Sequence, residues 1–210
     1  MSSLHFDFTE YATRQSILDQ VNAALGKERA ALAAATAQNA GVPDCMHHHP
    51  ADVYATIDAL NVSERVKADA RAIYEELTRA EAAVHQKDID QVHFHEVGRA
   101  SGIVNVVGIC AAMELLAPDA VTATPVQAGC GSVMCAHGEM PIPAPATAVI
   151  LDSGVPTCAE RLEGERCTPT SAAIIKHFVQ EFQGEGAKRI YFQGPVPEEP
   201  HAHHHHHHHE

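Results

Sequence analysis

The sequence predicts an α/β (or α+β) fold: a small sheet with packed helices, a long N-terminal helix and a disordered His-rich C-terminal tail. Aromatic residues make up only 5% of the 210 residues and Trp is absent. Ala is abundant, which favours closely packed helices over an aromatic-rich β-sandwich. Segments with apolar residues at helical spacing alternate with short stretches bounded by Gly or Pro, a pattern typical of mixed folds.

Periodicity predicts one long helix over residues 9–38, because Ile17, Val21, Leu25 and Leu32 recur at helical spacing. Further helices are expected over 50–60, from a Ser63 cap to about residue 84, over 103–115, over 146–152 and from Thr168 to about residue 182. Strands are expected over 91–96, 121–126, 133–135 and 155–158. We divide the chain into an N-terminal helical extension (1–43), a main domain (44–186) and a flexible His-rich tail (187–210).

The charge balance excludes some classes of partner. Lys and Arg total 14 against 27 acidic residues, so the formal net charge is -13. Such a surface repels phosphate backbones and attracts cations, so nucleic-acid binding is not expected. No segment reads as a signal peptide or a membrane span, so we expect a cytoplasmic protein whose six Cys stay reduced.

The 17 His residues are the outlier in the composition, and they gather in a few places. Adjacent His side chains in a loop can converge on a cation, with a nearby thiolate as a soft ligand; the alternative is an exposed polar loop. Such a loop holds Cys45, His47, His48 and His49. On a strand, His93 and His95 would share one face and Glu96 the other; the alternative is that they are core His residues bonded to backbone.

Three further segments are candidate ligand sites. Cys135 and His137 offer a thiolate and an imidazole close together, although the spacing is not that of a paired zinc motif. Thr168 and Thr170 at a helix start, with Gly138, are candidates for binding a nucleotide anion, and simple capping is the alternative for Thr168. The tail is either a native tract that acquires metal or a purification tag, and its imidazoles belong to His201, His203, His204, His205, His206, His207, His208 and His209.

Four motifs occur together in an order that resembles the LarC-type nickel-insertion proteins. They are Val92-His-Phe-His-Glu-Val-Gly98, Cys135-Ala-His-Gly138, Pro141-Ile-Pro-Ala-Pro-Ala-Thr147 and Thr168-Pro-Thr-Ser-Ala-Ala173. The resemblance implies nickel insertion into a pyridinium bisthiocarboxylic acid mononucleotide, the precursor of the nickel-pincer nucleotide, in a reaction that consumes CTP. It also maps His93, His95, Glu96 and His137 onto motif positions of the family.

The chain departs from the family pattern in three respects. The helix over 9–38 stands where the family opens with a strand and a Gly-rich segment containing Asp. The CTP-binding second domain is not in this sequence. Gly102 and Asn105 stand where the family has acidic residues. We therefore expect a shortened, divergent member that works with a CTP-binding partner chain and other cofactor-assembly proteins.

The function expected from these features is nickel binding and its delivery or insertion during nickel-pincer cofactor biosynthesis, as a lyase-class insertase if the chain is active. The expected ion is Ni²⁺, with Zn²⁺ or Mn²⁺ as alternatives. The alternative function is a non-catalytic nickel store, chaperone or regulator. A zinc hydrolase with Glu96 as base ranks last, because the sequence has no H-E-x-x-H helix. The long first helix would suit a homo-oligomer.

Overall fold

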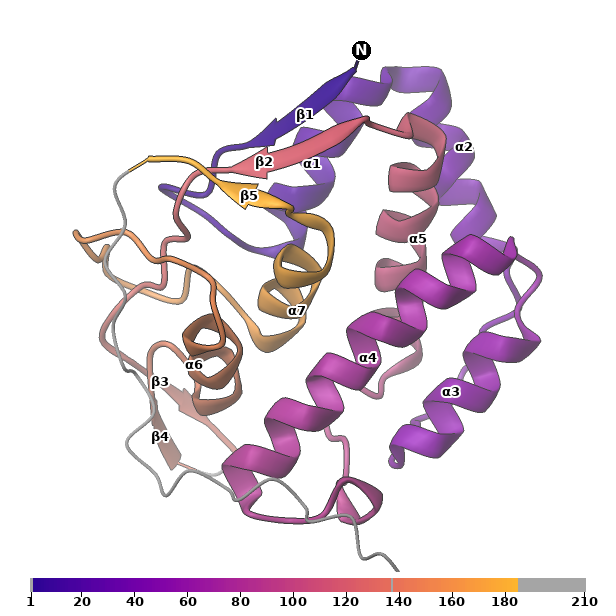
Figure 1. The fold of residues 1–210 in the computed structure, drawn as a ribbon. Helices are drawn as coiled ribbons and strands as arrows, with labels where there is room; N and C mark the ends of the chain where they lie inside the picture. The colour runs from indigo at the N-terminus through magenta and orange to yellow at the C-terminus, as the bar shows by residue number, and fades with distance from the viewer. Residues whose placement is uncertain (1, 137, 185–210) are drawn as a thin grey trace, which may run out of the picture.

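The computed structural model describes residues 2–136 and 138–184, and it confirms the predicted α/β class. Three parallel strands form a small sheet in the order β1-β2-β5, and helices α1, α5 and α7 lie on one side of it (Figure 1). The strands are β1 (Ser3–Phe6), β2 (Ala120–Ala123) and β5 (Glu181–Phe182), and a separate antiparallel hairpin is formed by β3 (Ser132–Cys135) and β4 (Gly138–Pro141). The helices are α1 (Arg14–Leu25), α2 (Lys27–Gln38), α3 (Pro50–Ala59), α4 (Glu64–His85), the 3-10 helix η1 (Ile89–Gln91), α5 (Ala100–Leu116), α6 (Pro145–Asp152) and α7 (Pro169–Phe178).

The first strand corrects the expectation that a helix replaces the strand with which the family opens. β1 pairs in parallel with β2, with Ser3 opposite Ala120 and Phe6 opposite Ala123. Its residues alternate between exposed and buried, so that Leu4 and Phe6 face the core. This period-two pattern was present in the sequence, but it spans only four residues.

The single helix predicted over 9–38 is wrong, because the chain forms two helices that meet at Gly26. Gly26 adopts a φ of 86°, a left-handed value that suits Gly and interrupts helical hydrogen bonding. Both helices pack against α5, and the Cβ of Ala37 lies 3.5 Å from where Gly108 would carry a side chain. The segment 1–43 therefore contributes a strand and two helices to the same hydrophobic core as the rest of the described chain.

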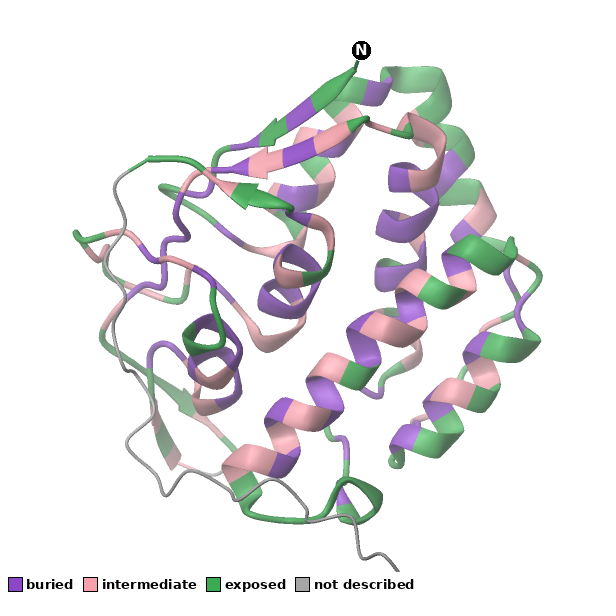
Figure 2. Cartoon of the chain, in the orientation of Figure 1, coloured by how far each residue is buried: buried purple, intermediate pink, exposed green. Residues whose placement is uncertain are grey.

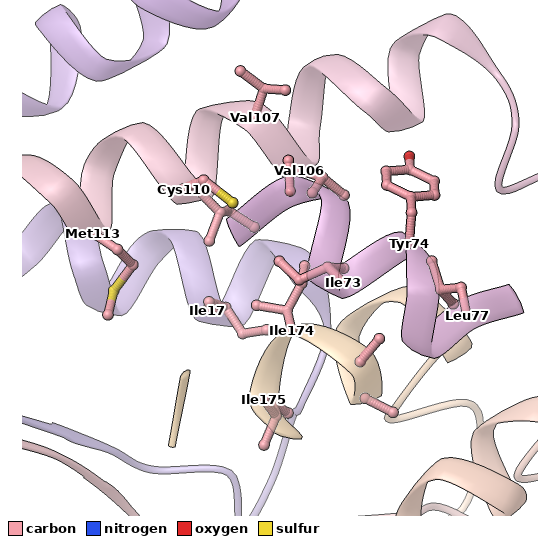
Figure 3. Packing of buried hydrophobic residues seen from close by; sticks show 14 of the residues in the cluster. Ile17, Ile73, Tyr74, Leu77, Val106, Val107, Cys110, Met113, Ile174 and Ile175 are labelled. Carbon is pink, nitrogen blue, oxygen red and sulfur yellow. The ribbon is translucent and has the colours of Figure 1, made fainter. Parts of the chain in front are cut away.

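The longest helix, α4, is at the centre of the packing. Ser63 caps it by accepting a hydrogen bond from the backbone N–H of Val66 at 3.1 Å, as predicted. The helix contacts α3, α5, α6 and α7, and buried positions recur along its length in Figure 2. Close by, Ile73 and Leu77 pack toward Ile174 of α7 (Figure 3). Cys110 of α5 is fully buried in the same core.

Two predicted strands are wrong and one predicted helix is too long. Residues 89–91 form η1 and 92–98 form a loop, because the backbone of this loop bonds to the His47 segment rather than to a sheet. Residues 155–158 contribute only an isolated bridge between Val126 and Thr157. The last helix ends at Phe178, and Phe182 belongs to β5.

Among the described residues, no helix has both the length and the apolar character needed to cross a membrane. His137 and the tail residues His201 and His203–His209 lie outside the described residues.

Candidate metal site

Backbone hydrogen bonds join two His-bearing loops that are far apart in the sequence. The N–H of His47 donates to the carbonyl of Gly98 at 2.8 Å, and the N–H of Phe94 donates to the carbonyl of His48 at 2.6 Å. Gly98 is required for this contact, because a Cβ at this position would lie 1.9 Å from the carbonyl oxygen of His47. The two loops are therefore held face to face by their main chains.

This pairing brings His49 and His93 together. Their ring centroids lie 4.6 Å apart, with the ring planes tilted by 59°. Metal–nitrogen bonds are about 2 Å long, so two nitrogens bound to one ion lie at most about 4 Å apart. Both residues are exposed. The sequence predicted each residue as a ligand but did not predict this pair.

His47 has a different environment from its neighbours. It is buried, its Nδ1 lies 3.2 Å from the carbonyl oxygen of Gly98, and its Nε2 lies 4.0 Å from the sulfur of Cys45. His48 and Cys45 are exposed. The three adjacent His residues therefore have different surroundings. The His47 side chain lies against the backbone carbonyl of Gly98, whereas the His49 ring contacts the ring of His93.

His95 and Glu96 are both exposed, and they lie beside different groups. His95 lines a small cavity together with His93. Glu96 is 3.8 Å from the guanidinium of Arg99. Partial burial, followed by the charge of Glu96, raises the pKa of Glu165.

Two possible metal ligands of this cavity were not predicted from the sequence: Glu81 and His85, near the end of α4. The Nε2 of His85 lies 3.3 Å from a carboxylate oxygen of Glu81. Burial raises the pKa of Glu81, and the neighbouring His85 and His95 oppose that shift. The Glu-x-x-x-His spacing, which places both side chains on one helix face, was the signal available in the sequence.

The remaining predicted ligands lie elsewhere or serve the fold. Cys135 ends β3 and its thiol donates to the carbonyl of Gly138 at 3.2 Å, while Gly138 turns the hairpin with a φ of 103°. Within residues 2–136 and 138–184, no three His, Cys, Asp or Glu side chains converge on a point that could hold a metal ion. The His49–His93 ring contact brings two predicted ligands together, and metal binding there stays a prediction.

Thr168 adopts the capping role that was the alternative to nucleotide binding. Its hydroxyl accepts from the N–H of Ser171 at 3.2 Å, and the Ser171 hydroxyl accepts from the N–H of Thr168 at 2.9 Å. Thr170 is half-buried in the first turn of α7. The structure thus shows what Thr168 bonds to in the fold and leaves nucleotide binding at Thr168, Thr170 and Gly138 a prediction.

A buried amide organises the loops at the carboxyl edge of the parallel sheet. The side-chain oxygen of Gln127 accepts from the N–H of Gly129 at 3.0 Å and of Leu162 at 3.1 Å. Its nitrogen donates to the carbonyls of Thr9 and Glu160. Gln127 thus holds the segments at Thr9, Gly129 and 160–162 together at this edge.

Imidazole is a ligand that transition-metal ions favour, and two imidazoles meet where these loops join. Comparison with known proteins identifies the family: the model for "Nickel insertion protein" matches residues 4–193, so the chain belongs to the nickel insertion protein family. The match includes β1, α1 and α2. No solved structure is significantly similar to the chain.

Three relatives illustrate the similarity. A Geobacter metallireducens protein is 50% identical over 129 residues, which are 61% of this chain and 33% of the relative. The pyridinium-3,5-bisthiocarboxylic acid mononucleotide nickel insertion protein of Desulfitobacterium hafniense is 42% identical over 137 residues, 65% of this chain and 34% of its own. The protein of the same name from Lactiplantibacillus plantarum is 39% identical over 149 residues, 70% of this chain and 33% of its own.

The matched region spans about a third of the length of these relatives. The names of the last two describe insertion of nickel into a nucleotide, and neither name describes storage or regulation. The alternative of a non-catalytic nickel store, chaperone or regulator therefore has no support from these relatives.

Proposed function

We propose that this chain takes part in inserting nickel into pyridinium-3,5-bisthiocarboxylic acid mononucleotide, during biosynthesis of the nickel-pincer nucleotide cofactor. The observation that carries the proposal is the contact between His49 and His93, 4.6 Å between ring centroids, in a chain of the nickel insertion family. Nickel is the cargo of this reaction. The His49–His93 pair holds the ion while the nucleotide binds it.

Two protein ligands suit an ion that must be passed on. Neutral imidazoles bind Ni²⁺ well, and a site with only two of them leaves positions for the sulfur atoms of the nucleotide. In our proposal the ion moves as Ni²⁺ by ligand exchange: sulfur–nickel bonds form, imidazole–nickel bonds break, and the imidazoles leave in their neutral form. The net charge of -13 attracts the cation to the surface.

The full reaction in this proposal requires CTP and a second chain. We propose a CTP-binding partner chain and other cofactor-assembly proteins as participants. The region matched in the relatives is about a third of their length. We place the reaction in the cytoplasm, where exposed thiols such as Cys45 stay reduced. A homo-oligomer through the N-terminal helices is the remaining partner hypothesis; it would use the exposed face of α2, where Leu32 is 55% exposed.

The test is transfer of nickel to the nucleotide. The full chain, loaded with Ni²⁺, is added with CTP and the mononucleotide to a cell extract depleted of the chain, and mass spectrometry measures the nickel-bound nucleotide. His49→Ala and His93→Ala should each lower transfer roughly tenfold or more, because metal sites are sensitive even to changes around their ligands.

His5→Ala is the matched control, since His5 is exposed on β1 and bonds only to Thr122 among the contacts that the structure gives it. It should transfer nickel like the unmodified chain. Equal transfer by His5→Ala, His49→Ala and His93→Ala would refute the role of the pair. No transfer by any form of the chain, with the extract active after addition of its own protein, would refute insertion itself.

A further inference from the structure

A small cavity lies where the end of α4 meets the loop that carries His93. Its volume is about 50 Å³, enough for more than one water molecule. Polar and titratable groups dominate the lining, which consists of Glu81, His85, Lys87, Val92, His93 and His95. Three His residues and one Glu thus line the same cavity, although no three of these side chains converge on one point.

Helix α4 contributes two paired residues to the cavity lining. Glu81 and His85 lie one helical turn apart, with 3.3 Å between the Nε2 of His85 and a carboxylate oxygen of Glu81. A nitrogen and an oxygen at that separation can both bind one divalent ion, given bonds of about 2 Å. The Glu81 side chain is only 19% exposed, which restricts its rotamers, while His85 is 54% exposed and open to solvent.

His93 is shared by the cavity and the His49–His93 pair. Its ring lies 4.6 Å from that of His49, and the same residue lines the cavity that holds Glu81 and His85. His93 is therefore the residue that connects the cavity with His49.

We propose that Glu81 and His85 form a loading site for a divalent transition-metal ion, from which the ion passes through His93 to the His49–His93 pair. The direction of passage rests on the proposed insertion function, whereas binding at Glu81 and His85 does not. Water molecules complete the coordination of the ion. The exposed Lys87 at the cavity weakens cation binding, as a site that must release its ion requires.

The alternative is that Glu81 and His85 form only an ion pair that supports the helix. Such pairs at i,i+4 spacing are common on exposed helix faces. A matched example on the same helix is Arg71, whose Nε lies 3.0 Å from a carboxylate oxygen of Glu75. That pair has no imidazole, so Glu75→Gln is the control for removing a carboxylate from α4.

The experiment follows Ni²⁺ binding in the full-length chain with His201 and His203–His209 replaced by Ala, so that the tail does not mask other sites. Titration calorimetry gives the stoichiometry, and His side-chain NMR signals show which imidazoles are broadened by the paramagnetic ion. We expect Glu81→Gln and His85→Ala each to remove one equivalent of bound nickel. Glu75→Gln should retain it.

Broadening should affect His85 and His93 at the lowest nickel concentrations, followed by His49. An unbroadened His85 at nickel concentrations that saturate His49 and His93 would overturn the loading site, as would an unchanged stoichiometry in Glu81→Gln. Glu81→Gln is nearly isosteric, so it remains informative if His85→Ala does not fold. Nickel binding at His85 in a chain that fails the transfer assay would reject insertion and keep this site.

Discussion

Replacing Gly98 by Ala should separate the two His loops. The new Cβ would lie 1.9 Å from the carbonyl oxygen and 2.9 Å from the carbonyl carbon of His47, with the Cβ of Phe94 at 3.1 Å. The closest atoms belong to backbone, so they cannot rotate away as a flexible side chain would. Ordinary contact requires about 3.4 Å, so the His47 carbonyl must move by about 1.5 Å.

The loss of stability follows from the contacts that this movement breaks. The His47 N–H bonds to the Gly98 carbonyl at 2.8 Å, and the Nδ1 of His47 approaches the same oxygen at 3.2 Å. Each net hydrogen bond contributes about 1 kcal/mol, and overpacking costs about 1–3 kcal/mol. We expect Gly98→Ala to lower the free energy of unfolding by about 2–4 kcal/mol, or the Tm by about 4–16 °C.

Urea unfolding followed by circular dichroism measures this change, and nickel titration shows whether the His49–His93 pair survives. The matched control is Gly102→Ala in the first turns of α5, where the nearest atom to a new Cβ is the Val97 carbonyl oxygen at 3.5 Å. Ala in a helix is favoured over Gly by roughly 0.5–1 kcal/mol, so this control should be neutral or stabilising. If both variants unfold at the same urea concentration as the unmodified chain, the close approach at Gly98 is not a constraint.

Three other substitutions test separate parts of the fold. Thr168→Ala removes the capping box of α7 and should cost about 1 kcal/mol by urea unfolding, with Thr170→Ala costing less; equal losses would argue against the cap. Gln127→Ala leaves the N–H groups of Gly129 and Leu162 without their acceptor and should cost about 2–4 kcal/mol, whereas an unchanged midpoint would show that water replaces the amide. Burial raises the pKa of Cys167 to about 12, against an ordinary value of 9.0, so above pH 9 the unfolded thiol loses its proton while the folded one keeps it. Stability should fall there as pH rises, by up to about 1.4 kcal/mol per pH unit from this thiol, and Cys167→Ala should flatten the slope relative to a Cys45→Ala control.

Local signals were sufficient to predict most of the helices. Ser63 and Thr168 carry capping hydroxyls, and Pro50 and Pro169 occupy first turns, so the starts of α3, α4 and α7 follow from residues next to each other in the sequence. The exact length of a helix is less local. The apolar pattern continues on both sides of Gly26, so the sequence pattern does not show that the helix ends there. Helices α1 and α2 each pack on α5, and this packing accompanies the break.

The sheet was harder to predict because its pairing is long-range. The side chains of His5 and Thr122 meet across 117 residues of sequence, and β1 has only four residues in which to display alternation. The hydrogen bonds that stabilise β1 come from β2, and β2 is followed by a chain that returns as β5 only after the hairpin and two helices. Such pairing depends on the whole topology rather than on a local window.

In the segment 92–96, the predicted alternation of buried and exposed residues is present, but a loop produces it rather than a strand. Phe94 is buried against Tyr74, with ring centroids 6.2 Å apart, while His93 and His95 are exposed on either side of it. This alternation is what predicted a strand. The structure produces it with a loop whose main chain bonds to the His47 segment, and that bonding requires Gly98 to lack a side chain. Main-chain bonding between two loops that are distant in the sequence therefore brings His93 beside His49, and no local pattern could show that contact.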